Sequence, residues 1–193
     1  MGVRIVVGLG NPGPEHEETR HNVGYRVVDR LAVRHDMPGW TRRGDRLEIA
    51  GRLADREILL VKPLTFMNRS GVALAALHRE NPFEPGELLV CYDDLDLPLG
   101  RLRVRPSGGT GGHRGMRSII ERLGTRAFPR LRVGIAPMSG GVRDATEFVL
   151  RPFRRSEHDE IDLAEERAGD AVECVVGEGI VAAMNRFNSE PEP

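Results

Sequence analysis

RIVVGLGNPG, residues 4–13, joins a short apolar run to a turn that contains three glycines and a proline. The apolar run predicts a buried first strand over residues 3–9. The spacing Gly-x-Gly-x-x-Gly is that of a dinucleotide-binding loop, which needs a helix that begins at the third glycine. Here PEHEETRHN follows, with no apolar period until Val23. We therefore expect a rigid turn that displays Asn11, rather than a nucleotide site.

Beyond this first strand, segments with the period of a strand alternate with segments with the period of a helix. This alternation predicts one α/β domain over residues 1–187, built on a twisted mixed sheet with helices on both faces. The ending NSEPEP, residues 188–193, is expected to form a disordered tail. Strands are expected in 47–62 (a hairpin), 87–92, 101–105 and 130–136, a turn-rich segment in 93–100, and helices in 22–35, 65–78, 116–123 and 156–187.

Composition is typical of a soluble protein with a single domain. The chain has 193 residues, of which 39% are hydrophobic and 30% are charged. No apolar run approaches the ~20 residues that span a bilayer, and the N-terminus lacks the features of a signal peptide. The two cysteines, Cys91 and Cys174, are far apart and lack metal-ligand spacing. We therefore expect a cytoplasmic protein with no membrane partner.

The net charge of −1 hides two segments of opposite charge. Residues 101–132 hold nine arginines and one acid, whereas residues 156–173 hold eight acids and one arginine. A clustered basic region is typical of proteins that bind polyanions. The alternative is an ordinary solvated surface, because Lys62 is the only lysine and arginine replaces lysine throughout the chain.

The basic segment has a regular pattern. Arg101, Arg103 and Arg105 alternate with apolar residues, so we expect their guanidinium groups on one face of a strand. Arg132 lies on the next predicted strand, and guanidinium groups in a row suit phosphate oxygens. SGGTGGHRG, residues 107–115, leads into a predicted helix whose first N–H groups attract anions. The pattern favours a phosphate-rich ligand, and the alternative is an exposed edge strand with a flexible connector.

Several polar residues are candidates for chemistry. His21 precedes a predicted helix and carries the side chain best suited to remove a proton near pH 7. It needs an orienting acid, and spacing does not choose among Asp93, Asp94 and Asp96. Asn68 is either a fixed amide donor for an oxyanion or a polar residue that competes with helix hydrogen bonds. No serine has a G-x-S-x-G context and no histidine pair has the H-E-x-x-H spacing, so we expect direct attack by water without a metal or cofactor.

Five stretches together resemble the bacterial peptidyl-tRNA hydrolase family: VGLGNPGPEHEETRHNVG, KPLTFMNRSG, YDDLDLPLGRLRVR, GGTGGHRG and RLRVGI. They span residues 6 to about 135 in the family's order. The resemblance implies a monomeric α/β hydrolase whose partner is peptidyl-tRNA. Such an enzyme cleaves the ester bond between peptide and tRNA, and so returns free tRNA to translation.

The resemblance also implies roles for the matching residues. His21 matches the general base, and Asp93 matches the acid that supports it. Asn68 matches the residue that holds water or stabilises the oxyanion, and Asn11 the residue that recognises the first peptide bond. His16 and Arg114 depart from the family's usual Tyr and Asn. Positions associated with substrate or tRNA binding are matched by His16, Phe66, Asn68, Arg114, Arg103, Arg105 and Arg132.

An alternative from another class is a non-catalytic RNA-binding protein with the same fold. The departures at His16 and Arg114 keep this alternative open, because both positions contact substrate in the family. The presence of His21 and Asp93 argues against it.

Overall fold

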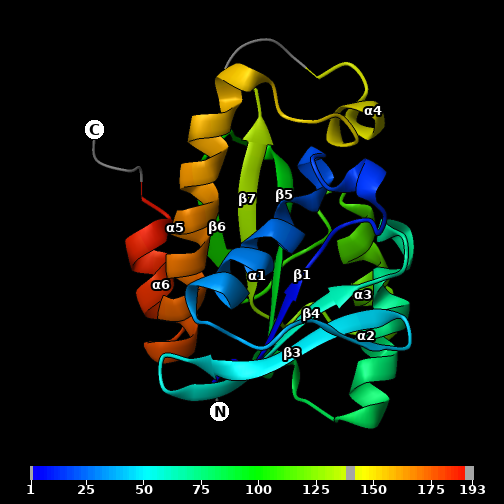
Figure 1. Ribbon diagram of the computed structural model, residues 1–193, viewed down its shortest axis with the longest axis vertical. Helices are drawn as coiled ribbons and strands as arrows, with labels where there is room; N and C mark the ends of the chain where they lie inside the picture. Colours follow the sequence, from blue (N-terminus) through cyan, green and yellow to red (C-terminus); the bar gives the residue numbers. More distant parts are fainter. Residues whose placement is uncertain (1, 138–141, 190–193) are drawn as a thin grey trace.

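Seven strands form one sheet in the computed structural model, which describes residues 2–137 and 142–189 (Figure 1). The strand order is β2-β3-β4-β1-β5-β7-β6. Strands β4, β1, β5 and β7 are parallel, whereas β2, β3 and β6 run antiparallel to their neighbours. The predicted mixed sheet is therefore confirmed. The strands are β1 (Ile5–Gly8), β2 (Thr41–Arg43), β3 (Arg46–Leu53), β4 (Arg56–Pro63), β5 (Leu88–Pro98), β6 (Leu102–Arg105) and β7 (Arg130–Ala136).

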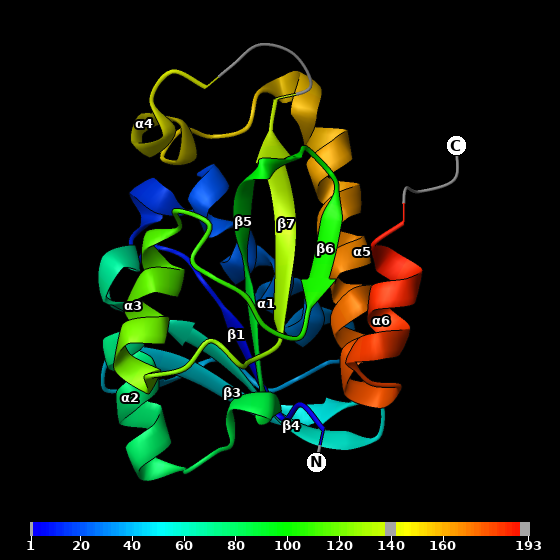
Figure 2. The ribbon, with the colours of Figure 1, turned by 180° about the vertical axis from the view of Figure 1, so that it is seen from behind.

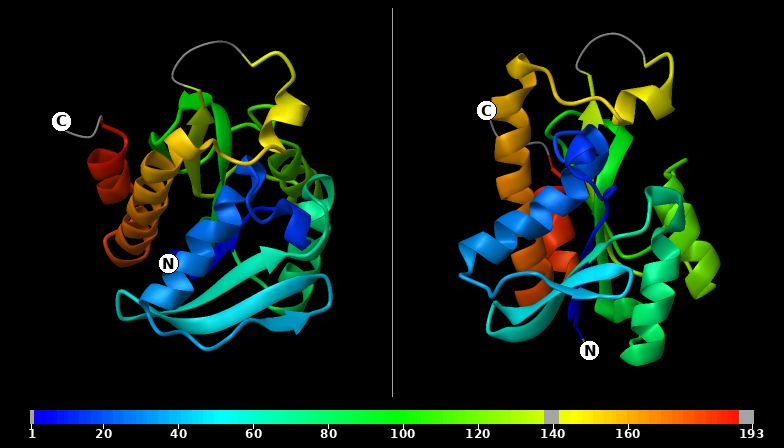
Figure 3. Two further views of the ribbon diagram at one scale, coloured as in Figure 1. Left: turned by 45° about the horizontal axis from the view of Figure 1, so that its top comes forward. Right: turned by 45° about the vertical axis from the view of Figure 1, so that its right-hand side comes forward.

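Helices cover both faces of the sheet, as predicted (Figures 2 and 3). Helices α1, α5 and α6 lie on one face, and α2 and α3 lie on the other. The α-helices are α1 (Val23–Arg34), α2 (Ser70–Glu80), α3 (Arg114–Leu123), α4 (Ala145–Val149), α5 (His158–Gly177) and α6 (Ile180–Phe187). The 3-10 helices are η1 (Pro14–His16), η2 (Arg20–Asn22), η3 (Met67–Arg69), η4 (Pro85–Glu87) and η5 (Arg155–Glu157).

Each face of the sheet has its own apolar core. In β1, Val6 packs into the core under α1 and α5, whereas Ile5 and Val7 pack into the core under α2 and α3. This alternation follows from the period of two in a strand. A central strand buried on both faces needs apolar residues throughout, which explains the continuous run at the start of the chain.

The glycines of the opening stretch allow close packing instead of nucleotide binding. A Cβ at Gly8 would lie 2.1 Å from the carbonyl oxygen of Gly24, so α1 rests directly on the backbone of β1. Gly13 has a φ of 110°, in the bend expected from the sequence. The three-residue η1 follows it, and α1 begins only at Val23. The helix N-terminus that a dinucleotide-binding loop needs is therefore not at this glycine.

Some element boundaries were predicted wrongly. Residues 93–98 continue β5, although their composition indicated a turn, because they form a ladder with β7 that is interrupted by a register shift between Asp94 and Pro98. The expected helix over 156–187 is two helices, because Gly179 has a φ of 96° and separates α5 from α6. Neither β2 nor α4 was predicted, since each is too short to show a period.

The outer edge of β6 is covered by the end of the chain. Asn188 accepts a hydrogen bond from the Val104 N–H at 2.7 Å and donates one to the Val104 carbonyl at 3.1 Å. Of the tail predicted over 188–193, residues 190–193 lie outside the described residues. Within the described part of the chain, no helix combines the length and apolar character needed to cross a bilayer.

Replacing Gly24 with alanine should destabilise the fold by about 3 kcal/mol. The new Cβ would lie 2.4 Å from the carbonyl oxygen of Cys91 and 2.5 Å from the Leu9 nitrogen, and both are backbone atoms that cannot rotate away. Gly39→Ala is the matched control, because its Cβ would meet nothing within 4 Å. Urea unfolding measures both, and a Gly24→Ala protein as stable as the control would contradict the packing argument.

Candidate active site

A cavity of about 350 Å³ lies where the parallel strands β1, β4 and β5 approach their carboxyl ends. Ligand sites in open α/β sheets favour this edge, because loops from several strands meet there. Segments far apart in the sequence supply its walls. The lining includes Asn11, His21, Phe66, Met67, Asn68, residues 93–96, residues 110–114, Ala145, Thr146, Val149 and Leu150.

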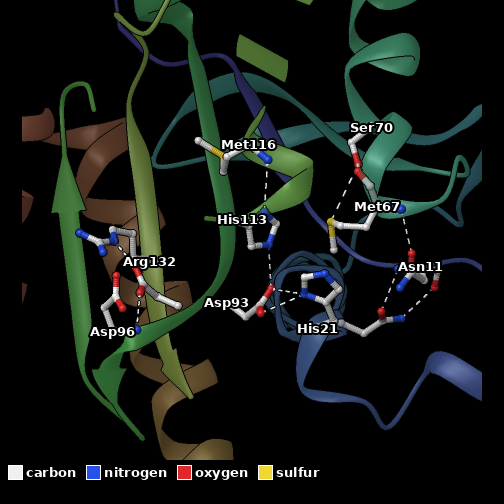
Figure 4. A network of polar contacts seen from close by, with 11 residues as sticks. Asn11, His21, Met67, Ser70, Asp93, Asp96, His113, Met116 and Arg132 are labelled. Atoms are coloured by element: carbon white, nitrogen blue, oxygen red, sulfur yellow. Dashed lines mark hydrogen bonds and ion pairs between the residues drawn. The ribbon is translucent and has the colours of Figure 1, made fainter. Parts of the chain in front are cut away.

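His21 and Asp93 are in direct contact at the wall of this cavity (Figure 4). The Nδ1 atom of His21 lies 2.8 and 2.9 Å from the two carboxylate oxygens of Asp93. His21 is 7% exposed and Asp93 is 3% exposed. An ionised carboxylate accepts only, so Nδ1 carries the donated proton, and Nε2 is left as a proton acceptor.

His113 also contacts Asp93, and sequence reasoning missed this residue. Its Nε2 lies 2.9 Å from Asp93 Oδ1, and its Nδ1 accepts a hydrogen bond from the Met116 N–H at 3.2 Å. The bond to Met116 fixes the proton on Nε2, which donates to Asp93. The signal in the sequence was a histidine placed just before a predicted helix, where a side-chain acceptor caps the first N–H groups.

The two imidazoles control the charge of Asp93. Burial acts to raise the pKa of this carboxyl, but electrostatic interactions and hydrogen bonds with His21 and His113 oppose burial, and the pKa falls well below its ordinary value. Asp93 is therefore ionised at neutral pH, and a buried carboxylate is stable when its oxygens are paired in this way.

His21, Asp93 and His113 are also the group that comes closest to a metal-binding set within residues 2–137 and 142–189. Their ligand atoms lie within 4.8 Å of one another. The ring nitrogens that face Asp93 are at hydrogen-bond distance from it, so a metal ion would have to displace both of these bonds. The absence of a metal stays a prediction.

The side chain of Asn11 is oriented by its neighbours. Its Oδ1 accepts a hydrogen bond from the Met67 N–H at 2.8 Å. This bond fixes the orientation of the amide and leaves its NH2 group available to donate to a ligand. The backbone of Asn11 is held by Asn22, which accepts from its N–H at 2.8 Å and donates to its carbonyl at 2.9 Å. Asn22 directly follows His21 in the chain, but no pattern in the sequence marked it as a functional residue.

The other predicted substrate residues lie at different places around the cavity. Asn68 is exposed on η3 and lines the cavity, as does Phe66, which is 59% exposed. His16 makes an edge-to-face contact with Phe66, with ring centroids 6.4 Å apart, and is not part of the lining. Arg114 begins α3, lines the cavity and donates to the Thr146 hydroxyl at 3.3 Å.

The arginines of the basic segment are not equivalent. Arg103 and Arg105 share one face of the edge strand β6, while Arg101 lies before this strand. Arg132, opposite Arg103 in the ladder, is ion-paired with Asp94. Arg130 is buried and donates to backbone carbonyls of Gly109 and Arg126, both at 2.9 Å, so it holds a loop instead of facing solvent.

The acidic segment is partly neutralised by ion pairs within the molecule. Seven of its eight carboxylates lie on α5, and several of these pair with arginines of α1, which packs beside it. These internal pairs explain how a chain with a net charge near zero can still present a basic edge. The pairs are Arg26 and Arg30 with Glu165, Arg30 with Asp162, and Arg34 with Asp170 and Glu173.

Comparisons with known proteins agree with one another. A family profile described as Peptidyl-tRNA hydrolase matches residues 5–193. The peptidyl-tRNA hydrolase of Syntrophomonas wolfei is 48% identical over 186 residues, which cover 96% of this chain and 100% of that protein. That of Chloroflexus aggregans is 48% identical over 185 residues, which cover 95% and 98%. The solved structure of peptidyl-tRNA hydrolase from Acinetobacter baumannii superposes with a TM-score of 0.90 at 31% identity, over 97% of this chain and 95% of that one.

The lowered pKa of Asp93 predicts a pH-dependent contribution to stability. The ionised form stabilises the fold above about pH 4, the ordinary range of the carboxyl, and this contribution is lost as the pH falls towards the folded-state pKa. Asp93→Asn should therefore lower the free energy of unfolding by about 1–3 kcal/mol at pH 7, and the difference from wild type should shrink below pH 4.

Urea unfolding at pH 7 and pH 3 measures this difference. The control is Asp96→Asn, which changes an exposed carboxylate three residues further along the same strand and should stay within about 0.5 kcal/mol of wild type. A deficit in Asp93→Asn that is equally large at both pH values would count against the ionised pair.

Proposed function

The chain belongs to the peptidyl-tRNA hydrolase family, and from this membership we propose that it hydrolyses the ester between a peptide and the 3′-terminal ribose of tRNA. The observation that carries the proposal is the contact between His21 and Asp93 at the wall of the cavity. This contact leaves one imidazole nitrogen as a proton acceptor, which is what the attack of water on an ester requires.

His21 acts as the general base in the proposed reaction. Its Nε2 removes a proton from water while the water oxygen attacks the ester carbonyl, and Asp93 stabilises the imidazolium that forms. The tetrahedral intermediate then collapses with cleavage of the bond to the ribose oxygen, which takes the proton back from Nε2. The products are the tRNA hydroxyl and the peptide's carboxylic acid, which loses its remaining proton to solvent. His113 supports this step by donating a second hydrogen bond to the carboxylate of Asp93.

Two asparagines bind the substrate around the scissile bond. Asn68 donates its amide N–H to the oxyanion as negative charge develops. Asn11, whose oxygen is held by Met67, presents its NH2 group to the carbonyl of the first peptide bond. A free aminoacyl-tRNA has an ammonium group in place of this carbonyl. An ammonium only donates hydrogen bonds, so it cannot accept one from the NH2 group of Asn11. This mismatch explains how the enzyme spares aminoacyl-tRNA.

The basic edge of the sheet binds the phosphates of the tRNA. Arg103 and Arg105 project from β6, and Asp94 binds the Nε of Arg132, which leaves the ends of that guanidinium for phosphate. At the cavity mouth, Phe66 and Arg114 contact the substrate, and His16 supports Phe66.

We also propose that the protein works as a monomer in the cytoplasm. All the groups assigned to the reaction come from one chain. Cys91 and Cys174 are free, buried thiols, which suits a reducing compartment.

Loss of the His21 imidazole should remove most of the turnover and little of the binding. We expect His21→Ala to lower kcat by about 10²–10⁴-fold with KM nearly unchanged, because general-base catalysis acts in the transition state. His35→Ala is the control, since this imidazole lies at the far end of α1 and pairs with Glu173.

Release of tRNA from N-acetyl-aminoacyl-tRNA, compared with free aminoacyl-tRNA, measures the reaction. Selective release from the blocked substrate is the expected result for the wild type. Binding of the blocked substrate without release would instead support the non-catalytic RNA-binding alternative.

Removal of charge from β6 should weaken tRNA binding and reduce its dependence on salt. We expect Arg103→Gln with Arg105→Gln to raise KM and to lower the slope of log Kd against log salt by roughly one to two units. The slope falls because fewer counterions are released on binding when fewer phosphates are contacted.

The control is Arg42→Gln with Arg43→Gln, which removes the same charge from β2 at the opposite edge of the sheet. Identical salt slopes in the two double variants would show that β6 is not the binding edge.

A further inference from the structure

Arg20, the residue before His21, is buried and unusually well connected. It is 2% exposed. Its Nη1 donates to the carbonyls of Arg151 and Pro152, and its Nη2 donates to Glu157 at 2.6 Å. The guanidinium carbon also lies 4.3 Å from the centroid of the Phe148 ring. One side chain on η2 therefore contacts five groups in residues 148–157: two carbonyls, one carboxylate and the rings of Phe148 and Phe153.

The segment that Arg20 binds carries one wall of the cavity. We call residues 145–150 the α4 wall, because Ala145, Thr146, Val149 and Leu150 all line the cavity. Helix α4 stands apart from the sheet and packs chiefly against η2, the element that carries Arg20 and His21 (Figure 1). The position of the α4 wall is thus set largely relative to His21.

A buried arginine is a costly way to hold a loop. Burial lowers the pKa of Arg20 although Glu157 acts in the opposite direction, and the Nε atom has no hydrogen-bond partner among the residues that the structure describes. Apolar residues of similar volume often stabilise a fold as well as buried charges do. A planar fork, however, fixes the distance and the orientation of the carbonyls it binds. What Arg20 provides beyond an apolar residue is therefore a defined position for the segment that it binds.

The α4 wall lies where a substrate side chain must go. The scissile carbonyl has to approach His21, and the side chain of the esterified residue is attached one carbon away from it. Val149 and Leu150 line the same cavity as His21 and present apolar surface, with Leu150 43% exposed. A large apolar side chain gains contact there, whereas glycine has no side chain to place.

We propose that Arg20 is a specificity-determining residue, which positions the α4 wall to bind the apolar side chain of the peptide's C-terminal residue. This inference rests on the proposed hydrolysis of peptidyl-tRNA. Arg20 does not touch the reacting atoms and acts through Val149 and Leu150.

The test compares N-acetyl-phenylalanyl-tRNA with N-acetyl-glycyl-tRNA. In Arg20→Lys, a single ammonium replaces the two guanidinium nitrogens that bind the carbonyls and Glu157. The ratio of kcat/KM for the phenylalanyl over the glycyl substrate should fall about tenfold, mainly through KM, as expected for a lost apolar contact. Glu157→Gln, which weakens the bond between Arg20 Nη2 and residue 157, should also lower the ratio, but by a smaller factor. A ratio within twofold of wild type in both variants would overturn the proposal.

A matched control and a second readout separate positioning from general destabilisation. Arg30→Lys alters an arginine whose partners, Glu165 and Asp162, lie on α5 and not on the α4 wall, so its ratio should match wild type. Hydrogen–deuterium exchange should rise in residues 145–150 of Arg20→Lys and not of Arg30→Lys. Unchanged exchange there would overturn the proposal even if the enzyme is active. A wild type that releases tRNA from neither substrate would refute the hydrolase function, while the exchange result would still test the link from Arg20 to the wall.

Discussion

The carboxylate of Asp93 is the constraint on which the site depends. A buried negative charge is expensive unless its oxygens are hydrogen-bonded, and here two imidazoles supply the donors. These donors come from η2 and from the residue that caps α3, so three segments remote in sequence must meet at one point. The hydrogen bond from the Met116 N–H to His113 Nδ1 adds a further constraint, because it sets both the start of α3 and the tautomer of His113. Local folding and the charge of the site are therefore coupled.

Arginines stabilise the surroundings of this point from several directions. Arg26 binds the buried Glu165 of α5 and donates to the carbonyls of Glu17 and Thr19, which precede His21. Arg20, in the same turn, donates to the carbonyl of Arg151 and so connects the turn to the segment that follows α4. The short helix that carries His21 has little apolar surface of its own, so guanidinium groups bound to carbonyl oxygens fix it in place. The acidic helix α5 thus contributes to the site without touching it.

The sequence predicted the elements whose signals are local. The first strand, the hairpin over β3 and β4, and helices α1 and α3 follow from apolar periodicity. Elements defined by distant partners were missed or misplaced. The end of β5 has the composition of a turn and is a strand because β7 pairs with it. Likewise, Arg130 belongs to a basic run in the sequence, yet it is buried because the loops that carry Gly109 and Arg126 bind its guanidinium.

The amino-acid sequence by itself determined the α/β class, the residue types available for acid–base chemistry and the resemblance that pointed to His21 and Asp93. Spacing could not choose among Asp93, Asp94 and Asp96, of which the first two are adjacent. Tertiary structure separated them, because successive side chains in a strand point to opposite faces: Asp93 meets the two histidines, and Asp94 meets Arg132. Tertiary structure also decided that His113 and Arg20 belong to the site's surroundings. Their partners lie 20 to 137 residues away in the chain, and a periodic pattern carries no information about contacts over such distances.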